Sequence, residues 1–384
     1  PKNYNYYNYK GSGVGVCEIT GNENWQGPAP FADKSNVALQ FFALGDTPYD
    51  DSCSTCNTCL KSDLVTKEED CKKYDCVLKS STLQDLPAHN TCTYEGPDYD
   101  CVKGKIIPYL NSKIDEGEAA FVVHAGDFIK GANIGKNKRC NPYSFASRRD
   151  LFSDATNFLI VPGDNDWNEC QGYDINSNTD TYRELWREFF AAKTTSPFNQ
   201  FSARFPSTLG FPGGSKPVVE RKDDTNPELF YFRQNNVAFF GLNRVSRESY
   251  ISDVAPSDVN AEWIEDRLSL DSVTCTLESI VVIAQTMPKD IVYQKLDNYF
   301  DICGSTLPTL TITGDLHPAS YCFEKSAHRL DLTVEAFKSG PIHVSVVRDP
   351  EGVLGDFFHV KDADPGKSNI ECPSFDRAYS SDES

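Results

Sequence analysis

Continuous apolar runs, rather than strictly alternating ones, recur along the first four fifths of the chain. Four of them end in the dipeptide Gly-Asp: QFFALGD at Asp46, FVVHAGD at Asp127, FLIVPGD at Asp164 and LTITGD at Asp315. Such runs are typical of strands covered on both faces, as in a parallel sheet. Glycine lets the chain turn, and the aspartate then lies at the carboxyl edge, where open α/β sheets bind ligands. Four carboxylates at one edge repel one another unless a cation lies among them, so the pattern predicts a metal site.

The rest of the pattern predicts further strands and helices. Strands are expected over 37–45, 119–126, 157–163, 279–285 and 309–313, and helices near 102–115, 143–156, 180–193, 257–270 and 290–301. The segment ELFYFRQNNVAFFGLN predicts a hairpin that turns at residues 234–236. Alternation near 331–348 and 353–360 predicts a closing antiparallel sheet. This order predicts an α/β (α+β-like) fold of two packed mixed β-sheets flanked by helices.

The segments outside this pattern divide the chain. Residues 1–36 form a Tyr-rich N-terminal arm, which is either a mobile terminus or a strand that pairs with a neighbour and so supports self-assembly. Residues 37–362 form the expected domain, and a Cys-rich insert at 50–103 interrupts it. Residues 363–384 form an acidic, Ser-rich tail.

Charge excludes some partners. The net charge of −19 and the pI near 4.7 disfavour binding to nucleic acid or to anionic membranes, since such a surface repels phosphates. No apolar run reaches the roughly 18 residues of a membrane span. The chain starts at Pro1 rather than Met, which predicts a trimmed N-terminus.

Cysteine usage bears on the compartment. The chain has 14 cysteines, seven of them between Cys53 and Cys101. A cytosolic protein would use C-x-x-C pairs for zinc, whereas a secreted one would form disulfides. The insert lacks a repeated C-x-x-C pair at finger spacing, and the other seven cysteines are spread singly. We therefore predict disulfides and a secreted, extracellular protein, with the connectivity left open.

The motifs resemble those of a known family. The segments GDTPY (45–49), VHAGD (123–127), PGDNDW (162–167) and GDLHPASY (314–321), with Gln285 between the last two, occur in an order similar to that of the calcineurin-like metallophosphoesterase superfamily. They look most like a divergent branch of it, over residues 37–345. The resemblance implies a metallophosphoesterase-type sandwich that hydrolyses phosphate esters with a metal-activated water.

The resemblance also implies roles for individual residues. Asp127 stands where the family has the carboxylate that bridges two metals, and Asp46 and His317 stand where it has ligands of the first metal. At the second metal, Asp164, Gln285 and Asp315 stand where the family has an asparagine and two histidines. Asn165 stands where the family has its catalytic histidine, and Asp166 lies directly behind it.

These departures change the expected cofactor. The family's histidines favour borderline metals such as Zn or Fe, whereas Asp164, Gln285 and Asp315 offer oxygen. We therefore expect one or two divalent ions, with Mn, Mg or Ca favoured over Zn and Fe. Two such cations activate a water and stabilise the charge of a phosphoryl group during its transfer.

The departures also affect proton transfer. Asn165 can donate a hydrogen bond but cannot transfer a proton near neutral pH. His124 is the alternative catalytic residue, although on a buried strand a histidine is more often structural. Arg244 is either an anion contact or, as we prefer, a surface charge.

One disulfide pairing is expected near the site. Cys140 and Cys170 both flank loops at the metal edge, so we expect them to form a bridge that holds those loops rigid. Trp167, which follows the third Gly-Asp motif, is expected to be a core or wall aromatic.

Two functions follow from this sequence. The first is a secreted, metal-dependent phosphoester hydrolase, supported by Asp46, Asp127, Asp164 and His317. The alternative is a catalytically impaired extracellular protein on the same fold, in which a cation fixes the loops and the surface serves structure, assembly or binding. The loss of a histidine at Asn165 supports this alternative.

Overall fold

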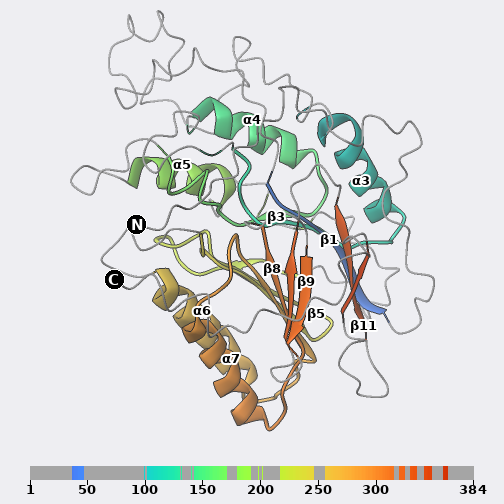
Figure 1. Cartoon of the computed structure of the whole chain (residues 1–384), viewed down its shortest axis with the longest axis vertical. Coiled ribbons are helices and arrows are strands. Elements are labelled where there is room, and N and C mark those ends of the chain that lie inside the picture. The colour runs from blue at the N-terminus through green and yellow to red at the C-terminus, as the bar shows by residue number, and fades with distance from the viewer. Residues whose placement is uncertain are drawn as a thin grey trace, which may run out of the picture.

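Two mixed sheets with helices on their outer faces form an α/β fold, as the sequence predicted (Figure 1). The computed structural model describes residues 37–46, 99, 102–129, 131, 140, 142–170, 180–191, 198, 201, 217–245, 256–314, 320–324, 329–334, 341–347 and 358–361. The N-terminal arm, the acidic tail and nearly all of the Cys-rich insert lie outside these residues, so the predicted division of the chain stays a prediction.

The first sheet has five strands in the order β12-β11-β1-β2-β3. Strands β1 (Val37–Leu44), β2 (Val122–His124) and β3 (Phe158–Ile160) run parallel. Strands β11 (Ile342–Val347) and β12 (Phe358–Lys361) extend the sheet in antiparallel fashion beyond β1. Three of the four Gly-Asp runs therefore end at the same edge of this sheet.

The second sheet has seven strands in the order β4-β5-β6-β7-β8-β10-β9. The strands are β4 (Glu220–Arg221), β5 (Phe230–Gln234), β6 (Val237–Gly241), β7 (Ser279–Ile283), β8 (Thr309–Thr313), β9 (Ser320–Glu324) and β10 (Arg329–Thr333). Strands β6, β7, β8 and β10 are parallel, and the rest of the sheet is antiparallel. The fourth Gly-Asp run, which is β8, therefore belongs to this sheet and not to the one that holds the other three.

Alternate side chains of each strand enter different apolar layers. On β1, Phe41 packs between the two sheets, against Phe121 and Phe239, whereas its neighbour Phe42 faces outward and contacts Tyr109. Both phenylalanines of β1 are fully buried. Coverage on both faces is the reason that these strands have continuous apolar sequences.

The helices form the two outer layers (Figure 1). Helices α3 (Ile107–Asp115), α4 (Pro142–Ser153) and α5 (Asp180–Phe190) cover the five-stranded sheet, and a π-helical turn, Val102–Ile106, leads into α3. Helices α6 (Pro256–Asp271) and α7 (Asp290–Cys303) cover the seven-stranded sheet. Among the helices of the described residues, none has the length and hydropathy of a membrane span.

The predicted hairpin is confirmed at β5 and β6. Its two turn residues, Asn235 and Asn236, have φ angles of 51° and 63°. Positive φ at both central residues is the mark of a type I′ turn, for which asparagine is well suited. The predicted closing antiparallel strands are confirmed for β11 and β12, which pair antiparallel with each other, as β11 also does with β1. Strand β10 differs, because it belongs to the other sheet and pairs there in parallel with β8.

Two disulfides lie among the described residues. Cys140 pairs with Cys170, as the sequence predicted, with their Cα atoms 5.2 Å apart. Cys275 pairs with Cys303 and connects the carboxyl ends of α6 and α7, with a Cα–Cα distance of 5.5 Å. The sequence had left this second pairing open.

Candidate metal centre

The ends of the four Gly-Asp strands meet, although the strands belong to two sheets. A Cβ atom added to Gly126 would lie 2.8 Å from the Cα of Gly163, and one on Gly45 would lie 3.3 Å from the Cα of Gly314. A Cβ on Gly314 would in turn lie 2.6 Å from the carbonyl oxygen of Ala125. Glycine is required at these positions because backbones approach closely there.

The sharp turn that we expected at glycine involves two of the aspartates and one of the glycines. Asp46 and Asp127 have φ angles of 60° and 62°, and of the four motif glycines only Gly126, at 87°, has a positive φ among the described residues. Few residues other than glycine adopt this left-handed region, and aspartate and asparagine are enriched among them. The amide of Asp46 is held by a 3.1 Å hydrogen bond to the carbonyl of Gly126. Such backbone outliers often occur at functional sites.

An amide lies between two of the carboxylates. The Nε2 of Gln285, which follows β7, donates hydrogen bonds of 3.1 Å to Oδ2 of Asp127 and of 3.1 Å to Oδ1 of Asp164. The two carboxylate oxygens are therefore separated by no more than twice this distance. Side chains of Asp127, Asp164 and Gln285, which come from both sheets, thus converge on one point.

Negative charge on the carboxylates is unfavourable at this point. Asp46, Asp127 and Asp164 are 1%, 3% and 5% exposed. Burial raises the pKa of Asp127 well above its ordinary value, and the charges of Asp164, Asp46 and Asp166 raise it further, whereas a hydrogen bond from the amide of Asn165 opposes the rise. A cation among these carboxylates would relieve both the repulsion and the desolvation.

Asp166 connects the loops of the site. Its Oδ1 accepts a 3.0 Å hydrogen bond from the amide of Asp127, and its Oδ2 accepts bonds from the amide of Gly163 at 3.2 Å and from Nε1 of Trp186 at 2.7 Å. Burial raises the pKa of Asp166 to about 8, although these three hydrogen bonds lower it. Its contacts are those of a residue that positions the loops after β2 and β3.

Asn165 lies between a carboxylate and a disulfide. Its amide donates a 3.0 Å hydrogen bond to Oδ1 of Asp127. Its carbonyl oxygen lies 3.6 Å from the sulfur of Cys140 and 4.0 Å from that of Cys170. Both cysteines are buried, so the bridge packs directly against the loop that carries Asp164 and Asn165.

His124 faces away from this point. It is fully buried on β2, and its ring lies 5.2 Å from that of Phe152 on α4 and 6.0 Å from that of Phe158 on β3. These are contacts within the layer between the sheet and its helices. We therefore leave His124 out of the candidate centre and treat it as a core histidine.

A second polar network was not predicted. Arg187 of α5 binds both oxygens of Glu228, at 2.9 and 3.1 Å, and Glu228 also accepts a 2.8 Å hydrogen bond from Nδ2 of Asn243. Glu228 is 1% exposed. The guanidinium groups of Arg183 and Arg187 lie 5.6 and 5.3 Å from the ring of Trp167.

Two further expectations concern side chains near these loops. Trp167 is 4% exposed, which confirms it as a core aromatic. Arg244 is only 8% exposed, so our preferred interpretation of it as a surface charge was wrong. Its Nε donates to the carbonyl of Met287, close to Gln285.

The last two predicted ligands, Asp315 and His317, lie outside the described residues. They follow Gly314, whose amide donates a 2.9 Å hydrogen bond to the carbonyl of Gln285. Within the described part of the chain, no three Asp, Glu, His or Cys side chains form a complete metal-binding group by themselves. The donors that do converge are carboxylates and an amide, which suit a hard, oxygen-seeking cation.

Neither a protein-family model nor a curated protein matches this sequence. Among solved structures, a 5'-nucleotidase from Candida albicans is similar with a TM-score of 0.41 and 12% identity, over 86% of this chain and 52% of that one. The sulfate thiohydrolase SoxB from Thermus thermophilus is similar with a TM-score of 0.36 and 11% identity, over 86% of this chain and 57% of that one. The chain thus spans little more than half the length of either.

Proposed function

We propose that this protein is a secreted, metal-dependent phosphoester hydrolase. The observation that carries the proposal is the position of Gln285 between the carboxylates of Asp127 and Asp164. These three side chains come from the ends of three strands in two sheets, and Asp46 adds a fourth strand end beside them. A group of buried carboxylates at such a junction has little structural value unless a cation is bound there.

The residues that would hold the ion are Asp46, Asp127, Asp164 and Gln285, together with Asp315 and His317. The nitrogen and oxygen of a glutamine amide exchange places when the amide turns by half a revolution. Gln285 can therefore donate to the two carboxylates in the absence of a cation and present its oxygen in the same place when one is bound. Oxygen donors favour Mn²⁺, Mg²⁺ or Ca²⁺.

Different residues of the protein would have different roles in hydrolysis. A bound divalent ion supplies an activated water and neutralises phosphoryl charge. The amide of Asn165 and the side chain of Gln285 orient Asp127, while Asp166 fixes the loops after β2 and β3. Asn165 cannot protonate a leaving group, so the proposal favours phosphate esters whose leaving group departs without a proton, such as aryl phosphates.

Secretion is part of the same proposal. The two disulfides among the described residues support an oxidising compartment, because such bonds are rare in the cytosol. The acidic surface disfavours nucleic acid as a substrate. The N-terminal arm remains our candidate for self-assembly.

The test measures turnover and ion binding separately. The purified full chain is assayed with Mn²⁺, Mg²⁺ or Ca²⁺ on an aryl phosphate and on an aryl diester, and its melting temperature is followed with each ion. We expect Asp127→Asn to abolish both hydrolysis and the stabilisation by the ion, which amounts to about 2.7 kcal/mol at a hundredfold excess over Kd. Asp297→Asn is the matched control, because Asp297 lies exposed on α7 and pairs with Arg329.

The outcomes distinguish the candidate functions. Ion-dependent turnover that survives Asp127→Asn would refute the site. If no ion supports turnover but Ca²⁺ still raises the melting temperature through Asp127, the structural, cation-stabilised alternative holds; the lack of a proton donor at Asn165 favours that alternative. If no ion changes the melting temperature, both proposals fail.

A further inference from the structure

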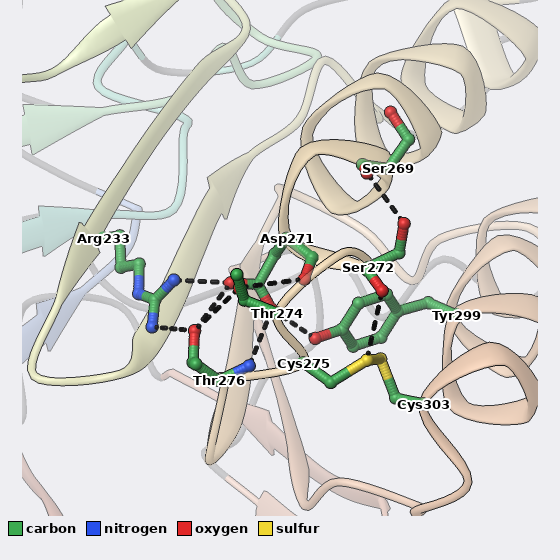
Figure 2. Close-up of a disulfide and its surroundings, with 9 residues drawn as sticks. All are labelled: Arg233, Ser269, Asp271, Ser272, Thr274, Cys275, Thr276, Tyr299 and Cys303. Atoms are coloured by element: carbon green, nitrogen blue, oxygen red, sulfur yellow. Dashed lines mark hydrogen bonds and ion pairs between the residues drawn. A yellow bond between two sulfur atoms is a disulfide. The ribbon is translucent and has the colours of Figure 1, made fainter.

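The disulfide between Cys275 and Cys303 lies at the carboxyl ends of α6 and α7, before β7 and β8 begin (Figure 2). The candidate centre lies where these two strands end. Cys275 is exposed and Cys303 is partly buried. Their neighbours Leu270, Val273 and Ile302 are 68%, 86% and 67% exposed, so solvent reaches this end of both helices. The other described bridge differs in this respect, because Cys140 and Cys170 are 0% and 1% exposed.

A separate set of contacts joins the same helix ends. The hydroxyl of Tyr299 on α7 donates a 2.6 Å hydrogen bond to the carboxylate of Asp271, the last residue of α6. Arg233 of β5 and Thr276 donate to the same carboxylate (Figure 2). The carboxylate of Asp271 thus connects α6, α7 and the seven-stranded sheet without help from the sulfur atoms.

Apolar packing also holds the two helices without the bridge. Trp263 and Ile264 of α6 and Leu296 and Phe300 of α7 are buried in one cluster against the outer face of the seven-stranded sheet. Opening the bridge removes none of these contacts. It does release Cys275, which is held at a φ of 47°, a value that few residues other than glycine adopt.

We propose that the Cys275–Cys303 bridge is a site of thiol–disulfide exchange with small thiols in solution, and that the domain remains folded when this bridge is reduced. The exposure of Cys275 gives a thiolate access to its sulfur. The Asp271 contacts and the packing of α6 on α7 keep the helix ends together afterwards. The proposal is independent of any metal-dependent activity.

The exchange consists of two balanced steps. A thiolate attacks Sγ of Cys275, its new S–S bond forms as the bond to Cys303 breaks, and the sulfur of Cys303 leaves as a thiolate that takes a proton from water. A second thiolate then attacks the mixed disulfide and releases the sulfur of Cys275, which is also protonated. Two small thiols are oxidised to one small disulfide, and one protein bridge is reduced to two thiols. The thiol of Cys275 then has an acceptor nearby, the carbonyl oxygen of Ser272 at 3.3 Å.

The experiment compares two bridges within one molecule. The native full chain is treated with dithiothreitol without denaturant, free thiols are trapped with iodoacetamide at intervals, and peptides containing each cysteine are quantified by mass spectrometry while far-UV circular dichroism is recorded. The Cys140–Cys170 bridge is the control, because its sequence separation of 30 residues nearly matches the 28 residues of Cys275–Cys303.

We expect Cys275 and Cys303 to be trapped at least about a hundredfold faster than Cys140 and Cys170, because reduction of a buried bridge must wait for local opening. The circular dichroism should not change during the fast phase. With reduced glutathione in place of dithiothreitol, the mixed disulfide should be found on Cys275. Equal trapping rates for the two bridges, or a mixed disulfide on Cys303, would overturn the proposed site.

A variant tests the second half of the proposal. The double substitution Cys275→Ser and Cys303→Ser should give a folded protein with the wild-type circular dichroism spectrum and a lowered melting temperature. Trapping of Cys140 and Cys170 should remain slow in this variant. The domain would be shown to need the bridge if this variant did not fold. The same conclusion would follow if Cys275 and Cys303 of the wild type were trapped only as fast as the circular dichroism signal is lost. Either result would refute the proposal that the domain stays folded without the bridge.

Discussion

Gly163 is the residue at which the convergence of the strand ends can be tested most directly. A Cβ atom at this position would lie 2.1 Å from both the amide nitrogen and Oδ1 of Asp127, and 2.8 Å from its Cα. Two of these three atoms belong to the backbone. Gly163→Ala therefore cannot be accommodated by a side-chain rotation alone, and the loops after β2 and β3 must separate.

The expected cost follows from this geometry. Overpacking costs about 1–3 kcal/mol where side chains can adjust. Because backbone must move by roughly an ångström here, we expect a loss of about 3 kcal/mol or more in the free energy of unfolding. At about 2–4 °C per kcal/mol for a large domain, the melting temperature should fall by at least about 6 °C. Separation of the loops should also remove the stabilisation by divalent cations, since it moves Asp127 relative to Asp164.

The assay is thermal unfolding of the variant with and without Mn²⁺, Mg²⁺ or Ca²⁺, next to a matched glycine substitution. Gly104→Ala is the control, because a Cβ at Gly104 has no atom within 4 Å and alanine suits a helical position better by about 0.5–1 kcal/mol. If Gly163→Ala melts at the wild-type temperature, or if it still responds to the cation as the wild type does, the close packing of the strand ends does not support a metal site.

Two further predictions concern the carboxylate of Asp271. Tyr299→Phe keeps the ring beside Phe300 but removes the donor of the 2.6 Å hydrogen bond. Urea titration should therefore show that the free energy of unfolding falls by about 1.5–3 kcal/mol. An unfolding midpoint that does not change, at constant slope, would contradict this prediction. The pKa of Asp271 lies below its ordinary value of 3.8, because burial raises it less than the hydrogen bonds from Tyr299 and Thr276 and the charge of Arg233 lower it. Its ionised form therefore stabilises the protein above the ordinary pKa, and this stability is lost as the pH falls through the lower pKa of the folded state. The difference in free energy of unfolding between the wild type and Asp271→Asn should therefore become smaller as the pH is lowered below about 4. A difference that stays constant over this range would refute the lowered pKa of Asp271.

The sequence predicted most strands to within a few residues, for a physical reason that the structure makes visible. The runs SIVVI and TLTIT, which became β7 and β8, are buried at every residue, because sheet packing covers one face and helices cover the other. Strands β4 and β9 were missed. Strand β4 has only two residues, and both strands lie at the edges of the seven-stranded sheet, where the apolar pattern of the sequence is weaker.

Membership of a sheet was harder to predict than the strands themselves. The fourth Gly-Asp run has the same pattern as the other three but lies in the second sheet. The pattern indicates that the strand is buried on both faces, but it does not indicate which strand lies beside it in the sheet. The meeting of the four strand ends nevertheless could be expected, because the Gly-Asp repeat marks positions where backbone must approach backbone closely.

The residues that support the site could not be predicted. The hydrogen bond from Trp186 to Asp166 spans 20 residues, and the ion pair of Arg187 with Glu228 spans 41. Each depends on how α5 lies across the loops of both sheets, which no local pattern encodes. A tryptophan followed by an arginine on an amphipathic helix is also common enough that it gave no signal.

Helix α5 holds loops of both sheets in place around the candidate centre. Its adjacent residues Trp186 and Arg187 bind two different loops: Trp186 holds Asp166, which fixes the loop after β3, and Arg187 holds Glu228, which fixes Asn243 after β6. One rigid helix therefore sets the positions of loops from both sheets relative to each other. Asp127 keeps its left-handed backbone within this frame, since its amide and its carboxylate both have fixed partners. A cation that entered such a frame would displace an amide donor and little else, so its binding energy would be spent on neutralising charge and not on folding the site.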